Sequence, residues 1–190
     1  MSARDDDTAL DALVAHARTY PKLSVEAVDQ LIATARGGDR GARSALVEHS
    51  LGVVLAEAIA RRDHGVEITE LFQEGSVAVV VAIEEYVEQS GTGAHFDTYV
   101  RRVVGGHLDH VIQREDAAAE ASAVVEDVRL LEAAQVALRR QLGHDPTETE
   151  LAAVLQWPPG RVEPIAAMLA AARERFDAEI VEYLDDDEAE

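Results

Sequence analysis

Hydrophobic residues recur at spacings of three and four along most of the chain, and stretches that alternate apolar and polar residues are scarce. Spacings of three and four place side chains on one face of an α-helix, whereas a half-buried strand needs a period of two. A chain of 190 residues is long enough to bury a core behind such faces. The pattern therefore predicts an all-α fold.

Two helices with recognisable end signals are predicted in the first third of the chain. The first follows Ser24, which suits an N-cap, and stops at Gly37 and Gly38. The second follows Asp39, another N-cap residue, and extends one apolar face toward Arg61. We expect the helix to end directly after this point, at Asp63, His64 and Gly65.

The segment after Thr69 is the most apolar of the chain, with the run VAVVVAI from Val77 to Ile83 at its centre. Its β-branched residues alone would permit a strand, but the flanks ELFQEG and EEYVEQ extend it beyond strand length. We therefore expect a helix capped by Thr69 that continues through Val87. Because the central run is apolar all round, we expect it to be buried on every side.

The next stretch is less regular. Residues 96–113 are predicted as a helix weakened by Gly105 and Gly106. Residues 115–126 are rich in alanine and acids, which leaves open a loosely packed helix or a linker. A further helix is expected over residues 130–142.

The C-terminal part of the chain shows a clear signal for the start of a helix and ends in a run of acidic residues. Thr147 with Glu150 three residues later fits a capping box that opens a short helix. The last fifteen residues hold eight acids and no base, which indicates a frayed helix end or disorder.

The charge balance limits the possible partners. Acids outnumber bases by 37 to 17, and the net charge of −20 opposes non-specific attraction to nucleic acid or to an anionic membrane. The acidic N-terminus differs from a signal peptide, and no apolar run approaches the roughly 20 residues that cross a bilayer. We expect a cytoplasmic protein with no membrane partner, in which any DNA contact is local.

Catalytic and metal-binding signals are weak. Without cysteine the chain cannot form a disulfide framework or a thiolate metal site. His107 and His110, followed by Glu115, are the one histidine pair with metal-like spacing, and no adjacent ligand completes the set. No phosphate-binding glycine loop or nucleophile–base–acid set is evident. We expect no enzymatic activity, no catalytic residue, no metal and no cofactor.

Four segments, in order between Leu23 and Met168, resemble the sigma-70 family of bacterial RNA polymerase specificity subunits. The first, LSVEAVDQLIATARGGDRGARSALVEHSLGVV, is similar to the helix pair that leads into the family's core domain, although Ser50 and Gly52 depart from its pattern. The fourth, LRRQLGHDPTETELAAVLQWPPGRVEPIAAM, is similar to the helical domain that follows. The stretch before this fourth segment is basic in the family and helps to hold promoter DNA, whereas here acids outnumber bases.

The second segment, ITELFQEGSVAVVVAIEEY, carries the most specific resemblance. It looks like the family's helix that binds the clamp helices of the largest polymerase subunit. The resemblance implies binding to the RNA polymerase core through Glu70, Gln73 and Glu74, which share one helical face. Two carboxylates and an amide there suit an arginine-rich partner surface. The alternative is a solvated acidic face.

The third segment, HFDTYVRRVVGGHLDHVI, resembles the family's helix that reads and opens the minus-ten promoter element. The resemblance implies DNA binding through Tyr99, which would stack on an unpaired base, and through Arg101 and Arg102, which would contact phosphates. The family's downstream basic residues are absent here. The alternatives are core packing for Tyr99 and ordinary surface positions for the arginines.

The resemblance and the pattern together imply an elongated, multi-helix core domain followed by a small three-helix middle domain. We expect an acidic N-terminal segment at 1–22, the core domain at 23–114, an acidic linker or helix at 115–128, the middle domain at 129–176 and an acidic tail at 177–190. No segment after the fourth resembles the family's C-terminal helix-turn-helix, which is then either lost or supplied by another chain.

The function implied by the resemblance is that of a sigma-like transcription protein. One mechanism is a truncated specificity factor that engages a minus-ten-like promoter element within the polymerase complex. Another is a sigma mimic that occupies the polymerase clamp without DNA. A third interpretation is a helical adaptor that binds an anti-sigma regulator. Family resemblance favours the factor, and the net charge favours the mimic.

Overall fold

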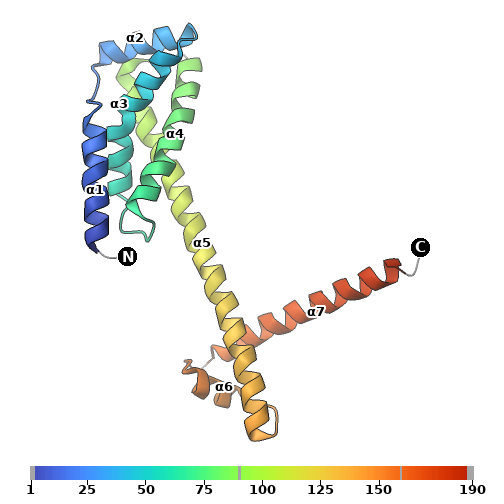
Figure 1. Cartoon of the computed structure of the whole chain (residues 1–190). Helices are drawn as coiled ribbons and strands as arrows, with labels where there is room; N and C mark the ends of the chain where they lie inside the picture. Colours follow the sequence, from blue (N-terminus) through green and yellow to red (C-terminus); the bar gives the residue numbers. More distant parts are fainter. Residues whose placement is uncertain (1–2, 90, 159, 188–190) are drawn as a thin grey trace. The chain divides into compact units, whose positions relative to one another are not determined.

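The computed structural model describes residues 3–89, 91–158 and 160–187. Within these ranges every regular element is an α-helix and no strand occurs, which confirms the predicted all-α fold (Figure 1). The chain divides into two compact units, Met1–Asp116 and Ala117–Glu190.

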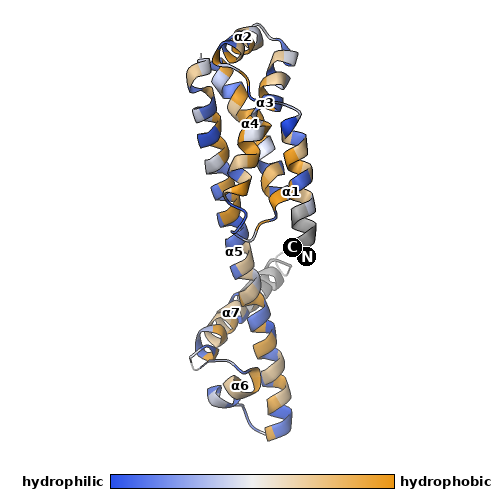
Figure 2. Cartoon of the chain, turned by 90° about the vertical axis from the view of Figure 1, so that its left-hand side faces the viewer, coloured by the Kyte–Doolittle hydropathy of each residue, from blue (hydrophilic) through white to orange (hydrophobic). Residues whose placement is uncertain are grey.

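The first unit is a helical bundle made of four whole helices and the beginning of a fifth. The helices are α1 (Ala3–Arg18), α2 (Val25–Arg36), α3 (Arg40–Ile59), α4 (Ile68–Glu88) and the N-terminal part of α5 (Gly93–Leu142). Figure 2 shows hydrophobic residues concentrated along α3 and α4, which lie at the centre of this bundle.

The predicted ends of the early helices are confirmed. The side chains of Ser24 and Asp39 each accept a hydrogen bond from the backbone N–H three residues on, at 3.2 and 2.9 Å, and so cap α2 and α3. The helix α2 ends at Gly37, and Gly38 then takes a φ of 92°. Glycine adopts that left-handed conformation without a steric penalty, so it allows the sharp turn into α3.

The helix α1 is not among the predicted elements, since residues 1–22 are expected only as an acidic segment. It packs on α3 and α4 through apolar side chains that recur at helical spacing. These side chains are Leu10, Leu13, Val14 and Ala17. That spacing is the signal in the sequence from which the helix follows.

One continuous helix, α5, takes the place of the three segments predicted between residues 96 and 142. Residues 115–126 are helical throughout. Gly105 and Gly106 do not interrupt the helix, because burial of the neighbouring side chains outweighs their low helix propensity. The fully buried side chains of this stretch are Val100, Val104, Leu108 and Val111.

The second unit joins the C-terminal part of α5 to α6 (Glu148–Leu155) and α7 (Val162–Asp187). The predicted capping box at the start of α6 is confirmed, since Thr147 and Glu150 exchange backbone-to-side-chain hydrogen bonds of 2.8 and 3.3 Å. The core of this unit consists of Leu131, Ala134, Leu138, Leu151, Val162 and Ile165.

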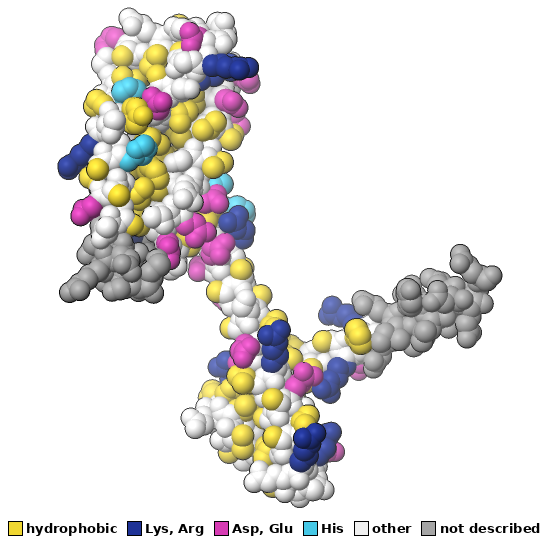
Figure 3. Space-filling view, in the orientation of Figure 1, with side chains coloured by type: hydrophobic (Ala, Val, Ile, Leu, Met, Phe, Trp, Pro, Cys, Tyr) yellow, Lys and Arg dark blue, Asp and Glu magenta, His cyan; other side chains and the backbone are white. Residues whose placement is uncertain are grey.

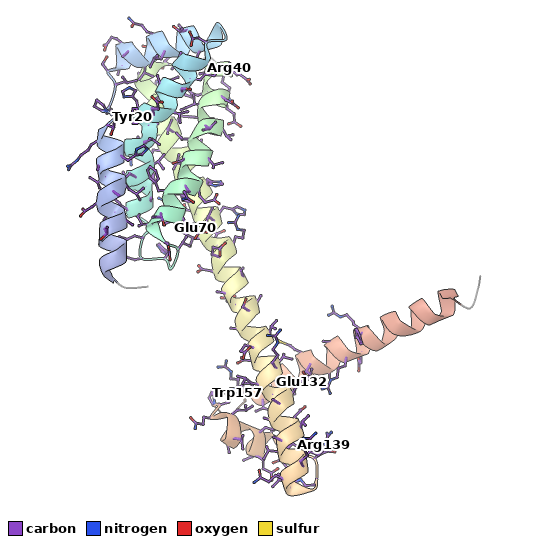
Figure 4. All side chains as sticks on the ribbon, viewed as in Figure 1. Tyr20, Arg40, Glu70, Glu132, Arg139 and Trp157 are labelled. Atoms are coloured by element: carbon purple, nitrogen blue, oxygen red, sulfur yellow. The ribbon has the colours of Figure 1, made fainter. Side chains whose placement is uncertain are left out.

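Ion pairs link α5 to the rest of the second unit. Arg161 binds Asp127 at 2.6 Å, and Arg173 binds Glu132 at 2.8 Å. Figure 4 labels Glu132 on α5, opposite the start of α7. The acidic tail continues α7 as far as Asp187, and its last residues, 188–190, lie outside the described residues.

Candidate functional site

The helix α4 carries the three side chains predicted to bind polymerase. It begins at Ile68, a core residue whose side chain is 7% exposed. The preceding Glu67 makes no side-chain cap. The prediction that Thr69 caps this helix is therefore wrong: Thr69 lies in the first turn, and the burial of Ile68 fixes where the helix starts.

One side of α4 packs against α3 and α5. Leu71, Val79 and Ile83 are buried there. Gly75 lies so close to its neighbours that a Cβ atom would come within 2.8 Å of Val54 on α3. A side chain at this position would force the helices apart, so glycine is needed in the middle of α4.

The opposite side of α4 is open. Glu70 and Gln73 are exposed, and so are the side chains of Val77, Val80 and Val81, by 61%, 42% and 50%. The prediction that the valine run is buried on every side is wrong, because α4 packs on its neighbours with its other side. Figure 3 shows hydrophobic and acidic side chains next to one another on the surface over α4. We call this surface the α4 face.

The predicted polymerase-binding residues lie together on the α4 face. Glu70, Gln73 and Glu74 line one shallow hollow with Thr69 and Val77. Figure 4 labels Glu70 near the start of α4, on the outside of the bundle. Within the described part of the chain, the side chains of Glu70 and Gln73 have no hydrogen bond or ion pair, so they are free to meet a partner.

Glu74 differs from the other two because it already has a partner. Its Oε2 atom lies 2.9 Å from Nε2 of His107 on α5, and both side chains are about one third exposed. The contact ties the α4 face to α5 and holds one carboxylate oxygen in place. Sequence spacing could not reveal this pair, since the two residues are 33 positions apart.

Tyr99 packs against α4 through its ring and its hydroxyl. The hydroxyl donates a hydrogen bond to Oε2 of Glu85 at 3.0 Å, and the ring centroid lies 4.7 Å from that of Tyr86. Burial raises the pKa of Tyr99, and the hydrogen bond to Glu85 raises it further. The guanidinium of Arg102 lies 5.5 Å from the ring centroid, within the range of a cation–π contact.

Arg101 is held by an acid of α3. Its NH1 atom lies 2.6 Å from Oε1 of Glu57, whose other oxygen lies 2.7 Å from NH1 of Arg61. Arg61 also binds Asp109 at 2.7 Å. A Cβ atom on Gly105 would come within 3.0 Å of Arg61, so this glycine makes room for the contacts. We call Glu57, Arg61, Arg101 and Asp109 the α3–α5 ion network.

Within the α3–α5 ion network, Arg61 and Asp109 stabilise each other's charged forms. The hydrogen bond from Arg61 lowers the pKa of Asp109 below its ordinary value of 3.8, and the same hydrogen bond raises the pKa of Arg61. Glu57 and Arg61 are only 13% and 17% exposed, so water screens their attraction less than it screens a surface pair.

The structure therefore groups the candidate residues into two sets. The polymerase-binding candidates share the α4 face, whereas the DNA-binding candidates lie on α5 and contact neighbouring side chains. No group of three His, Asp or Glu side chains in the described ranges could hold a metal ion. No helix described is long and apolar enough to cross a membrane.

Comparisons with known proteins point in one direction. No protein-family model matches the chain. RNA polymerase sigma factor SigA of Clostridium acetobutylicum is 26% identical over 178 residues, which cover 89% of this chain and 46% of that protein. SigA of Lactococcus lactis subsp. cremoris is 24% identical over 206 residues, which cover 95% of this chain and 56% of that protein. The chain spans about half the length of these relatives, and the similarity supports the resemblance to the sigma-70 family.

Proposed function

We propose that this chain is a sigma-like transcription protein that binds the RNA polymerase core at the clamp helices through the α4 face. The observation that carries the proposal is the position of Glu70 and Gln73. They are exposed and have no partner within the described residues, in the segment with the most specific resemblance to a polymerase-binding helix. The similarity to SigA over most of the chain supports the same partner.

The chemistry of the α4 face suits a basic and partly apolar partner. Carboxylates bind arginine through charge-assisted, often bidentate hydrogen bonds, which are stronger than neutral ones. The exposed Val77, Val80 and Val81 add apolar area next to these charges. Burying that area on binding contributes about 25 cal/mol per Å². Apolar contact at the centre with charged groups beside it is typical of protein interfaces.

The direct test is a double substitution, Gln73→Ala with Glu74→Arg, in a pull-down of the RNA polymerase core. Losing one side of a desolvated charge pair costs about 2–5 kcal/mol, and reversing the charge costs more, so we expect retention of polymerase to be lost. A circular dichroism spectrum with unchanged helical content shows that the variant is folded.

A matched control makes the same two kinds of substitution, of a glutamate and of a glutamine, on another helix of the unit. Glu26→Arg with Gln30→Ala on α2 changes two exposed side chains of the same unit, and we expect polymerase retention to be unaffected. If the α4 double variant retains polymerase as well as the unmodified chain does, the proposal is wrong. Recovery of a small regulator without polymerase subunits would favour the adaptor.

A second candidate function is contact with a minus-ten-like promoter element inside the polymerase complex. The observation that favours it is Arg102, which lies over the ring of Tyr99 and has no ion pair in the described ranges. Tyr99 and Arg102 together could hold an unpaired base and its phosphate. The ion pair of Arg101 with Glu57 argues against this second function, since Arg101 would first have to give up its partner.

This candidate is tested with polymerase and the chain together on a single-stranded minus-ten-like oligonucleotide. A specificity factor captures the oligonucleotide, and Tyr99→Ala and Arg102→Ala each weaken capture. A sigma mimic gives less capture than polymerase with an ordinary sigma factor, and neither substitution changes it.

A further inference from the structure

A shallow groove lies between the first half of α3 and the second half of α4. Val47, Val80 and Ile83 form its apolar part, and Arg40 and Arg43 form its basic part. Val80 also belongs to the α4 face, so the groove and the face make one continuous surface. We call it the α3–α4 groove.

Arg43 differs from the other arginines of this unit. Its Nε atom is enclosed and has no hydrogen-bond partner in the part of the chain that the structure describes. By contrast, Arg36 donates to two backbone carbonyls at 2.8 and 3.2 Å, and Arg61 and Arg101 bind carboxylates. An enclosed N–H group without an acceptor has lost its water and gained nothing in return. An acceptor in the groove would bind the terminal N–H groups of Arg43, which have no partner within the described residues either.

The groove is a local exception in an acidic chain. Arg40 and Arg43 form no ion pair within the described ranges, although the net charge of the chain is −20. Glu48 and Glu84 also line the groove, but neither lies within ion-pair distance of an arginine. A planar guanidinium binds a carboxylate with two parallel hydrogen bonds. The groove therefore suits an acidic side chain flanked by apolar ones.

The two ends of the continuous surface differ in charge: the end at Glu70 and Glu74 carries acids alone, whereas the groove also carries Arg40 and Arg43. Figure 4 labels Glu70 near the start of α4 and Arg40 at the opposite end of the bundle. The valines of the α4 face lie between them. Along α4, about 16 Å separates Gln73 from Glu84, at 1.5 Å per residue. A helix of about three turns in a partner can cover this distance.

The geometry points to a docking helix with charges of opposite sign at its two ends. This inference rests on the proposed function. The polymerase helix that packs on the α4 face carries basic side chains opposite Glu70 and Gln73 and apolar side chains opposite the valines. Its other end carries a carboxylate that enters the α3–α4 groove and pairs with Arg43. The charge order fixes the direction of the helix, because the reverse direction places acid against acid.

The test compares dissociation constants for the purified RNA polymerase core and the full chain. We expect Arg43→Gln to weaken binding about tenfold and Arg40→Glu to weaken it at least as much. Arg40 is exposed and lies in the groove but not on the α4 face, so its substitution keeps the test open should Arg43→Gln destabilise the fold. Arg18→Gln removes an exposed arginine of α1 and serves as the matched control, with no expected change.

Including Gln73→Ala with Glu74→Arg in the same series separates this inference from the proposed function. Loss of binding in both sets of variants supports both. If the Gln73–Glu74 variant loses polymerase while Arg43→Gln and Arg40→Glu bind normally, the groove is not part of the interface and the proposed function stands. If none of the variants weakens binding, both are wrong.

Discussion

The α4 face and the adjoining part of α5 carry the two sets of candidate site residues, and they use charge in opposite ways. On the α4 face, Glu70 and Gln73 are exposed and have no partner in the described ranges. On α5, Arg101 is held by Glu57, and Tyr99 is bonded to Glu85. Both sets lie on long helices of one bundle, and Arg101 is itself exposed. Pairing therefore distinguishes Glu70 and Gln73 from Arg101 and Tyr99, and not exposure or the type of element.

The difference bears directly on which surface can bind a partner. A side chain without an internal partner loses only its hydration when it meets an external one. A side chain that is already paired must also give up its existing contact. Glu70 and Gln73 are therefore better prepared for binding than Arg101, and the α3–α5 ion network serves the fold.

The largest expected effect comes from breaking the α3–α5 ion network. Glu57→Gln leaves Arg61 and Arg101 without their shared carboxylate, and we expect the free energy of unfolding to fall by about 2–4 kcal/mol. The matched substitution Glu84→Gln on α4 removes an exposed carboxylate and should change it by less than about 0.5 kcal/mol. Urea denaturation measures both. Equal losses would contradict the contrast between the two regions.

A smaller effect distinguishes the two neighbouring glycines of α5. Gly105→Ala pushes a methyl group against Arg61, so we expect it to destabilise the chain by about 1 kcal/mol. Gly106→Ala meets open space and gains helix propensity, so we expect it to stabilise the chain by about 0.5–1 kcal/mol. Thermal unfolding should move in opposite directions for the two variants. A shift in the same direction would show that the network does not depend on Gly105.

The smallest expected effect is on DNA binding by the isolated chain. Basic side chains strengthen DNA binding when they neutralise phosphates and release the counterions bound there. The net charge of −20 and the internal pairing of Arg101 leave few basic side chains free to do so. Typical non-specific binders reach only about 10⁻⁴ to 10⁻⁶ M by that route. Fluorescence anisotropy with a labelled duplex at physiological salt should therefore show no binding. Micromolar binding would mean that the arginines of α5 are free to bind phosphates.

The sequence predicts much of the fold because its local signals are strong. Ser24, Asp39 and the Thr147 capping box give correct helix starts, since each depends on residues only three positions apart. The spacing that reveals α1 is equally local, from Leu10 to Ala17, but the acidic composition of the segment obscures it.

The candidate site is harder to predict, because its properties arise from contacts between distant residues. The open side of α4 follows from which of its faces packs on α3 and α5, and an all-apolar run such as VAVVVAI does not specify that face. The pairing of Glu74 with His107 and of Arg101 with Glu57 likewise joins residues 33 and 44 positions apart. The sequence therefore names Glu70, Gln73 and Glu74 without indicating how each is held.

Site-specific photo-crosslinking tests the central claim most directly. A photoreactive phenylalanine derivative at Val77, at the centre of the α4 face, should form an adduct in cells with the clamp helices of the largest polymerase subunit. The same group at Val25, an exposed valine of α2, should give no such adduct. An adduct from Val77 that maps to the clamp helices supports polymerase binding through this face. Adducts with other proteins alone, or no adduct while polymerase still co-purifies with the chain, would contradict it.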